Sequence, residues 1–302
     1  MEALKSAIED ARSRYVSANP LSQAADRDAT LHLPGGNTRT ILHFEPFPLT
    51  MVKGNGAELT DLDGHTYVDC VGEYSAALFG HTNEVIVAAI REALDGGVAM
   101  GAPTRFERDL AGLVCERFPG IDQVRFCNSG TEANLMALSS ARVMTGRNKL
   151  LAFNDAYHGG VIKFIGGACS LNVPFDFALA DYNDIDGTAA MIDEIGGELA
   201  AVIVEPILGA GGNIQGNRQF LSMLREKTRD LEALLIFDEV QCGIGRTGNL
   251  WAYQGYGVEP DILTAAKPLA NGLPIGAILM RQKVADAIHP GDHASTFAGN
   301  PY

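Results

Sequence analysis

The sequence predicts an α/β fold in which helices flank a mostly parallel sheet. Three observations lead to this prediction. From about residue 120 onward, short strand-like segments alternate with helical ones. The strand-like segments are continuous apolar runs, which is typical of strands that are covered on both faces. The chain has 302 residues, 46% of them hydrophobic, which is enough for a large core.

The first 120 residues predict a different set of elements. The start, "MEALKSAIEDARSRYVSANP", has the spacing of an amphipathic helix, and "LHLPGGNTRT" is a loop. The stretch 48–70 contains strand-like pieces broken by "GNG" and "LDGH", which are hairpin signals. Helical spacing returns in "TNEVIVAAIREALDGG" and "RFERDLAGLVCERFPG". We therefore expect an N-terminal helix and strand segment at 1–60 and a large domain at 61–302.

The rest of the chain supplies the alternation. The strands that we expect are "QVRFCN", "KLLAFN", "LAAVIVEP", "ALLIFDEV", "DILTAAK" and "IGAILM". The helices among them are "TEANLMALSSARVMTGR", "TAAMIDEIGG" and "RQFLSMLREKTRDLE". Ligands of such sheets bind beyond the carboxyl ends of the strands, so polar residues at those ends are the functional candidates.

Composition narrows the class of protein. The formal net charge of −14 opposes binding to nucleic acid and to anionic membranes. The sequence has no run of eighteen apolar residues, so we expect no membrane span. The five cysteines form no CxxC pair, so we expect neither a disulfide framework nor a metal site. The N-terminus resembles neither a secretion signal nor a transit peptide, and we expect a reducing, cytoplasmic location.

Two strand ends carry residues suited to binding. Ser129, Gly130 and Thr131 follow "QVRFCN" and open a helix, where free N–H groups and the helix dipole favour an anion. The alternative is an ordinary helix cap. Tyr157 follows "KLLAFN" in "YHGG" and could stack on a flat ligand. The alternative is a packed loop aromatic.

Two further strand ends carry charge. Asp238 ends "ALLIFDEV", where a buried carboxylate needs a partner, and a protonated ring nitrogen would serve. The alternative is a structural carboxylate that caps a loop. Lys267 ends "DILTAAK", where burial would lower its pKa and leave more of the nucleophilic neutral amine. The alternative is a lysine whose stem is buried and whose amine reaches solvent.

Taken together, the four strand ends describe one ligand. They offer a phosphate site at 129–131, a stacking ring at Tyr157, an acidic partner for a ring nitrogen at Asp238 and an amine for an aldehyde at Lys267. Pyridoxal 5′-phosphate (PLP) has all four features. We therefore expect Lys267 to form a Schiff base with PLP.

The sequence resembles the class III aminotransferases, a group of PLP-dependent enzymes of fold-type I. The motifs that carry the resemblance are "NSGTEAN", "YHGG", "VEPILGAGG", "FDEVQCGIGRTG", "AKPLANGLPIGA" and "STFAGNP", in the order of the family. The resemblance covers nearly all of the chain after about residue 30. It implies the large domain of fold-type I, a mostly parallel sheet flanked by helices, at 61–302. It also implies catalytic roles for Lys267 and Asp238.

The resemblance assigns further cofactor contacts. Gln241 resembles the residue that contacts the ring hydroxyl, and Glu205 the glutamate of the "EP" turn near the cofactor. A purely structural role for Glu205 is the alternative. Thr296 resembles a threonine that reaches the phosphate of the neighbouring subunit, which implies a homodimer.

Different stretches resemble different branches of the family. "PGGNTRTILHFEPFPL" and "EYSAALFGH" are similar to the β-amino acid aminotransferases and glutamate-1-semialdehyde aminomutases, in which the arginine of the first stretch holds the substrate carboxylate. Arg39 is thus the substrate candidate, with Tyr74 a second, and a solvated loop arginine is the alternative. The segment from "FDEVQ" to "LPIGA" is similar to acetylornithine-type enzymes. Leu208 and Ala210 stand where those enzymes usually have Gln and a second Glu, which favours the β-amino acid branch.

The expected activity is transfer of an amino group from a β- or ω-amino acid to a 2-oxo acid. An aminomutase on the same scaffold is the second hypothesis. The family usually continues for roughly another hundred residues into a C-terminal small domain, and the sequence stops at "STFAGNPY". A non-catalytic homologue that lacks this domain is therefore the third hypothesis.

Overall fold

The computed structural model describes residues 1–302, with the exception of the Thr40 side chain. The chain forms two compact units. The first, here called the N-terminal unit, comprises Met1–Gly72 and Phe79–Val87. The second, here called the sheet unit, comprises Glu73–Leu78 and Ala88–Tyr302. The domain boundary that we expect at residue 60 stays a prediction.

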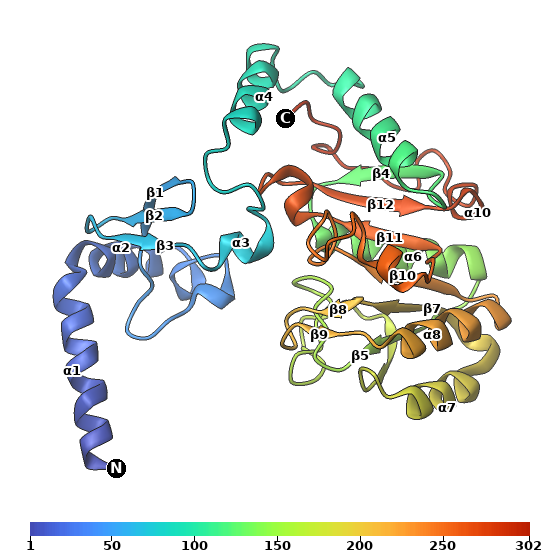
Figure 1. Ribbon diagram of the computed structural model, residues 1–302, viewed down its shortest axis with the longest axis horizontal. Coiled ribbons are helices and arrows are strands. Elements are labelled where there is room, and N and C mark those ends of the chain that lie inside the picture. Colours follow the sequence, from blue (N-terminus) through green and yellow to red (C-terminus); the bar gives the residue numbers. More distant parts are fainter. The chain divides into compact units, whose positions relative to one another are not determined.

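The N-terminal unit combines two helices with a small antiparallel sheet (Figure 1). Its elements are α1 (Glu2–Ala18), α2 (Pro20–Thr30), β1 (Met51–Asn55), β2 (Glu58–Asp61) and β3 (Thr66–Val68). Gly56 and Gly64 take positive φ angles in the turns between these strands, a conformation that glycine adopts without steric cost. Strands β1 and β2 pair antiparallel, and so do β2 and β3, which confirms both predicted hairpins.

The sheet unit is built around seven strands in the order β4-β12-β11-β10-β7-β5-β6. They are β4 (Gln123–Cys127), β5 (Lys149–Phe153), β6 (Asp176–Ala180), β7 (Leu199–Val204), β10 (Leu234–Asp238), β11 (Ile262–Ala265) and β12 (Gly276–Met280). Only β12 runs against its neighbours, β11 and β4. The mostly parallel sheet is therefore confirmed. A separate ribbon pairs β8 (Ile207–Leu208) with β9 (Ile214–Gln215).

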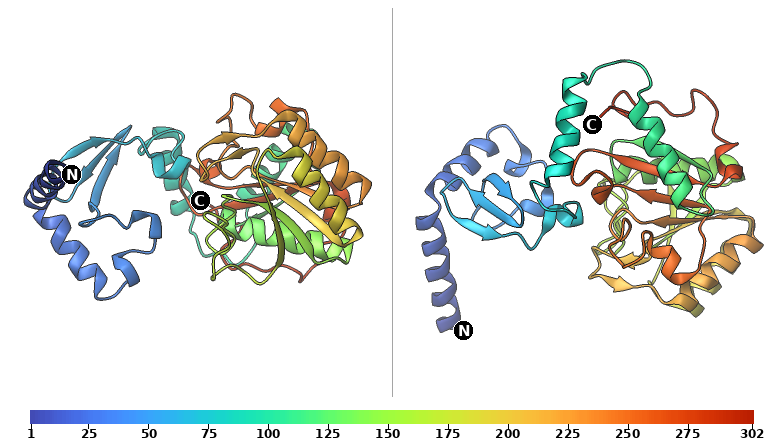
Figure 2. Two further views of the ribbon diagram at one scale, coloured as in Figure 1. Left: turned by 90° about the horizontal axis from the view of Figure 1, so that it is seen from below. Right: turned by 45° about the horizontal axis from the view of Figure 1, so that its top comes forward.

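Helices cover both faces of this sheet, as Figures 1 and 2 show. The helical segments after residue 71 are α3 (Gly72–Ser75), α4 (Glu84–Asp95), α5 (Arg105–Arg117), α6 (Gly130–Thr145), α7 (Ile185–Ile195), α8 (Arg218–Asp230), α9 (Ala252–Tyr256) and α10 (Gln282–Ala285). Helix α6 packs against β7, β11 and β12, and α8 packs against β7 and β10. Every residue of β7 and β10 is buried, which explains their continuous apolar sequences.

Small side chains bring α6 close to the sheet. Ala133, Ala137 and Ala141 recur every fourth residue and are fully buried, so they form one helix face without bulky groups. The sequence did not predict the half-buried strand β6 or the short helices α9 and α10. Strand β11 also ends at Ala265, two residues earlier than "DILTAAK" indicates.

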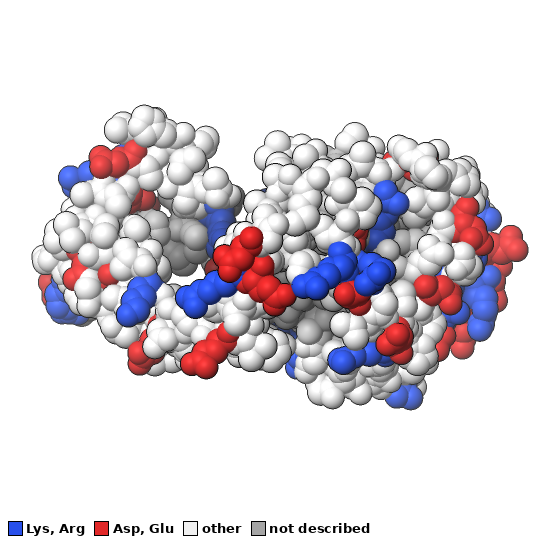
Figure 3. Space-filling view, turned by 90° about the horizontal axis from the view of Figure 1, so that it is seen from above, with Lys and Arg blue, Asp and Glu red and all other residues white. Residues whose placement is uncertain are grey.

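Charges of both signs share the surface drawn in Figure 3, where Lys and Arg side chains lie among Asp and Glu side chains. Among the described residues, no helix combines the length and the apolar character that crossing a membrane requires.

Candidate active site

The candidate residues gather where the parallel strands end. Strands β4, β5, β7, β10 and β11 run in the same direction, so their carboxyl ends meet at one edge of the sheet. Asp238 is the last residue of β10, and Glu205 follows β7 directly. Ser129, Tyr157 and Lys267 follow β4, β5 and β11 within a few residues.

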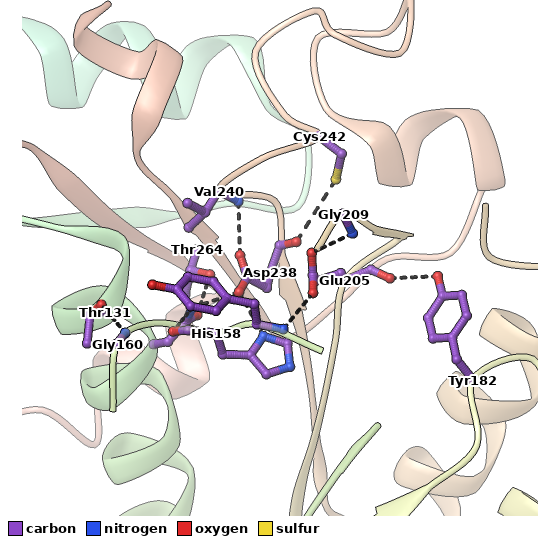
Figure 4. A network of polar contacts seen from close by, with 12 residues as sticks. Thr131, His158, Gly160, Tyr182, Glu205, Gly209, Asp238, Val240, Cys242 and Thr264 are labelled. Carbon is purple, nitrogen blue, oxygen red and sulfur yellow. Dashed lines mark hydrogen bonds and ion pairs between the residues drawn. The ribbon is translucent and has the colours of Figure 1, made fainter. Parts of the chain in front are cut away.

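Asp238 lies at the centre of the hydrogen-bond network in Figure 4 and is 3% exposed. Its Oδ2 atom accepts hydrogen bonds from Asn134 Nδ2 at 2.7 Å and from His158 Nδ1 at 2.8 Å. Its Oδ1 atom accepts one from the Val240 N–H at 3.0 Å. Three donors therefore hold this carboxylate in one orientation, which suits an acceptor for a further N–H group.

Lys267 is the first residue of a short 3₁₀ turn that follows β11, and Pro268 comes next. Its φ angle of 40° lies in the left-handed region, which a side chain disfavours and which recurs at functional sites. Burial lowers the pKa of Lys267, although Asp238 and Glu205 act in the opposite direction. More of its amine is therefore neutral near pH 7 than in an exposed lysine, as a nucleophile requires.

The start of α6 offers hydroxyl and backbone donors. Ser129 Oγ accepts a hydrogen bond from the Glu132 N–H at 3.1 Å, so Ser129 is the N-cap that the alternative describes. Thr131 Oγ1 accepts one from the Gly160 N–H at 3.2 Å. Both hydroxyl groups act as acceptors here, so each keeps its own hydrogen for a bond to an anion.

Two glycines allow the segments of the site to approach closely. A Cβ atom on Gly130 would lie 2.9 Å from the Val240 methyl carbons and 3.5 Å from Ala266 Cβ. A Cβ atom on Gly159, whose φ is +135°, would lie 2.8 Å from Thr131 Cα. The start of α6 thus touches the segments that carry Asp238 and Lys267, and only glycine leaves the required space.

Glu205 holds the loop that carries Tyr157. Its two carboxylate oxygens accept hydrogen bonds from the Tyr157 N–H and the Gly209 N–H, each at 3.0 Å. Burial raises the pKa of Glu205, while these N–H groups and His158 act in the opposite direction. Both oxygens bind backbone, which favours the structural alternative for Glu205. Tyr157 itself is 41% exposed.

Gln241 and Tyr74 also belong to the sheet unit. Gln241 lies three residues after Asp238, and its side-chain amide faces Gly209. Tyr74, with a φ of 53°, lies in a left-handed turn together with Ser75. Arg246 donates a hydrogen bond to the Ser75 carbonyl at 2.7 Å, which ties this turn to the loop after Gln241.

The other two candidates, Thr296 and Arg39, both lie at exposed positions. Thr296 is exposed and follows Ser295, whose hydroxyl accepts a hydrogen bond from Asn128 at 2.6 Å. Arg39 is exposed and belongs to the N-terminal unit, whereas Asp238 and Lys267 belong to the sheet unit.

Sequence reasoning missed three buried polar residues around Asp238. They are Asn134, His158 and Thr264. Each occurs in a stretch that predicts an ordinary helix, loop or strand, so its immediate sequence does not indicate which residue it contacts. Two of them could still have been noticed as polar residues at buried positions, Asn134 on the sheet-facing side of α6 and Thr264 within the apolar strand β11.

The residues at this edge fit PLP. Asp238 is a buried acceptor without a Lys or Arg ion pair among the described residues, and it can face a protonated ring nitrogen. Lys267 supplies an amine with a lowered pKa. The hydroxyl groups of Ser129 and Thr131 at the start of α6 suit a phosphate.

Comparisons with known proteins identify the family. The model of the family "Aminotransferase class-III" matches residues 43–302. The chain is 42% identical to the β-phenylalanine transaminase of Variovorax paradoxus, over 99% of this chain and 69% of the relative. It is 40% identical to a glutamate-1-semialdehyde 2,1-aminomutase of Lysinibacillus sphaericus, over 93% of this chain and 70% of the relative.

Solved structures agree with this assignment. The crystal structure of a β-phenylalanine aminotransferase from Variovorax paradoxus superposes with a TM-score of 0.94, over 98% of this chain and 70% of that one. A transaminase with PLP bound is 30% identical and superposes with a TM-score of 0.87, over 94% of this chain and 71% of that one. The sheet unit accordingly has the PLP fold-type I architecture. The chain belongs to the class III aminotransferases and is a PLP-dependent aminotransferase.

Proposed function

We propose that the protein transfers an amino group from a β- or ω-amino acid to a 2-oxo acid and that Lys267 forms the Schiff base with PLP. The observation that carries the proposal is the placement of Lys267 and Asp238 at the ends of the adjacent strands β11 and β10. The lowered pKa of Lys267 supports it. The 42% identity to a β-phenylalanine transaminase supports the choice of donor.

The cofactor contacts follow from the chemistry of each side chain. Asp238 would accept a hydrogen bond from the ring nitrogen, and Tyr157 would stack on the ring. Ser129, Gly130 and Thr131 would bind the phosphate through hydroxyl and backbone donors. Gln241 would contact the ring hydroxyl. Glu205 would act indirectly, because both of its oxygens hold the backbone of neighbouring loops.

Bound PLP supplies an aldehyde that condenses with amines and a ring that accepts electrons. Lys267 Nζ has two tasks in the proposed mechanism. As a neutral amine it would hold the cofactor through its aldehyde, and as an acid–base group it would hold and move a proton at the substrate carbon. Asp238 would stabilise a positive charge on the ring nitrogen.

The donor is recognised by residues that the sequence suggests. Arg39 would bind the substrate carboxylate, because a guanidinium group can donate two parallel hydrogen bonds. Tyr74 would line the site beside the donor side chain. Its left-handed turn, held by Arg246, supports this role, because backbone strain concentrates at functional sites.

An aminomutase is the second candidate. The 40% identity to a glutamate-1-semialdehyde aminomutase favours it. The two reactions differ in whether the amino group leaves the carbon skeleton, so an acceptor requirement distinguishes them.

The proposal includes a homodimer located in the cytoplasm. Exposed Thr296 supports the dimer, because its side chain is available to a second copy of the chain. The five cysteines are all free, which supports a reducing compartment.

The visible absorption spectrum of the purified chain with added PLP tests the proposal. We expect a yellow band that the Lys267→Ala variant lacks. β-Phenylalanine should bleach this band, and 2-oxoglutarate should restore it.

Each other outcome has a definite meaning. A band that persists in Lys267→Ala would reject Lys267 as the Schiff-base residue. Bleaching by glutamate-1-semialdehyde, with no need for an acceptor during turnover, would favour the aminomutase. A folded wild-type chain that gives no band would reject cofactor binding by this chain.

A further inference from the structure

Asn134 occupies a buried position between three structural elements. It belongs to α6, and its side chain reaches β10 through Asp238, β11 through Thr264 and the loop after β5 through His158. Asn134, Thr264 and His158 are each at most 1% exposed. Figure 4 shows Thr264 and His158 beside Asp238. No part of the chemistry proposed above uses Asn134 or Thr264.

The contacts of Asn134 allow only one orientation of its amide. Its Nδ2 group donates both of its hydrogens, one to Asp238 Oδ2 at 2.7 Å and one to the His158 carbonyl at 2.9 Å. Its Oδ1 atom accepts the Thr264 hydroxyl hydrogen at 2.6 Å. A flipped amide would place Oδ1 against two acceptors, so the hydrogen-bond chain runs in the direction Thr264 to Asn134 to Asp238.

The same reasoning assigns a hydrogen to His158. Its Nδ1 atom faces the Oδ2 atom of Asp238, which already accepts a hydrogen bond from Asn134, so Nδ1 is the donor. His158 Nε2 is buried and has no hydrogen-bond partner among the described residues. Among the described residues, the His158 side chain therefore hydrogen-bonds to Asp238 alone, and the carboxylate meets side-chain donors from two directions.

We propose that Asn134 and Thr264 are positioning residues for PLP chemistry, because they fix the Asp238 carboxylate relative to the strand that leads to Lys267. Thr264 lies three residues before Lys267, so the chain connects the acid that faces the ring nitrogen with the segment that carries the amine. The inference rests on the proposed role of Asp238. It adds that the orientation of Asp238 depends on the hydroxyl group of Thr264.

Substitutions at Thr264 separate the hydroxyl group from the shape of the side chain. Thr264→Val keeps the volume and removes the donor, while Thr264→Ser keeps the donor. Thr188→Val is the matched control, because Thr188 is equally buried and its hydroxyl has no hydrogen-bond partner among the described residues. The readouts are the PLP dissociation constant and the pH midpoint of the visible band of bound PLP.

We expect Thr264→Val to weaken PLP binding by about three- to tenfold, the effect of losing one buried hydrogen bond. We also expect it to shift the pH midpoint. Thr264→Ser and Thr188→Val should keep both readouts near those of the wild type. The charged or titratable groups that act on the pKa of Lys267 are Asp238, Glu205 and Cys242, and these variants leave all three in place.

An unchanged dissociation constant and pH midpoint in Thr264→Val would overturn the inference. If Thr264→Val does not fold, Thr264→Ala replaces it, and equal readouts for Thr264→Ala and Thr264→Ser would overturn the inference. Asp238→Asn separates this failure from that of the proposed function. If Asp238→Asn weakens PLP binding and Thr264→Val does not, the inference alone fails. If Asp238→Asn also has no effect, the role of Asp238 fails.

Discussion

The amino ends and the carboxyl ends of the parallel strands form two opposite edges of the seven-stranded sheet, and a buried aspartate lies at each. The two aspartates have different partners. At the amino edge, Asp261 lies just before β11 and pairs with Arg225 at 2.8 Å and with Lys283 at 2.6 Å. At the carboxyl edge, Asp238 accepts hydrogen bonds from Asn134, His158 and the Val240 N–H instead.

The difference supports a structural role for Asp261 and the functional role that we propose for Asp238. Burial alone would raise the pKa of Asp261, but Arg225, Lys283 and the Leu235 N–H together hold it below its ordinary value. The chain's own cations therefore neutralise Asp261. Asp238 is instead oriented by an amide, an imidazole and a backbone N–H, and no Lys or Arg side chain pairs with it among the described residues.

The largest expected effect is that of Asp238→Asn. The substitution keeps the shape of the side chain and removes the charge that, in the proposed function, would face the ring nitrogen. We expect kcat to fall by about 10²–10³-fold, the scale of a lost electrostatic contact in an active site. Steady-state kinetics with β-phenylalanine measure this. A kcat within twofold of the wild type would contradict the proposed catalytic role of Asp238.

Asp261→Asn should instead affect folding. Arg225 and Lys283 would lose their anionic partner, and we expect a loss of about 2 kcal/mol in the free energy of unfolding. Urea denaturation of the PLP-free chain measures it, and PLP binding by the folded fraction serves as the control. Weakened PLP binding with unchanged stability would contradict the structural role of Asp261.

Glu239 provides a pH-dependent test next to Asp238. Its carboxylate accepts hydrogen bonds from the Ala252 and Tyr253 N–H groups at the start of α9. Burial nevertheless raises the pKa of Glu239 from 4.5 to about 8. The folded state thus binds this proton more tightly than the unfolded state, and the stability that the proton contributes is complete below pH 4.5 and lost as the pH rises to about 8.

Glu239→Gln should remove this pH dependence. We expect the thermal midpoint of the wild type to fall relative to that of Glu239→Gln between pH 5 and pH 8, a range inside the titration window that runs from 4.5 to about 8. Calorimetry at several pH values measures the difference. A constant difference across the range would show that Glu239 does not titrate there.

The smallest effect is expected at the surface. Lys227 contacts the Asp193 carboxylate at 2.6 Å and 2.7 Å, but the Asp193 side chain is 62% exposed. We expect Lys227→Met to change the free energy of unfolding by about 0.5 kcal/mol or less, because water screens exposed ion pairs. Urea denaturation of Lys227→Met and Asp261→Asn under the same conditions measures both losses of stability. A much larger loss in Asp261→Asn would show that burial, rather than ion pairing itself, makes the Asp261 pair important for stability.

The sequence predicted the parts of the fold that depend on local signals. Six of the seven strands of the large sheet are apolar runs that end near polar residues, and Asp238 ends its strand as expected. The start of α6 follows from Ser129 and Gly130. The sequence did not predict strand β6, which is the outermost strand of the sheet. It is only half-buried, so its segment "DFALA" lacks the long apolar run that marks the buried strands.

The site was predictable only where a residue's chemistry shows in its own neighbourhood. Lys267 and Asp238 stand out as charges beside apolar runs. Asn134 and Thr264 do not, because their contact joins residues 130 positions apart, and only the packing of α6 on β11 brings them together. The role of Arg39 stays a prediction, because Arg39 belongs to the N-terminal unit and Asp238 and Lys267 belong to the sheet unit.

The contact between Gly130 and the neighbouring strand ends has a consequence for ligand choice. Because Gly130 lets the start of α6 pack closely against Val240 and Ala266, the proposed phosphate-binding residues lie directly against the segment that leads to Lys267. Under the proposed function, this close packing would set the distance between the phosphate group and the carbonyl carbon of a bound aldehyde. We therefore expect an aldehyde whose spacing differs by one methylene to bind less well than PLP.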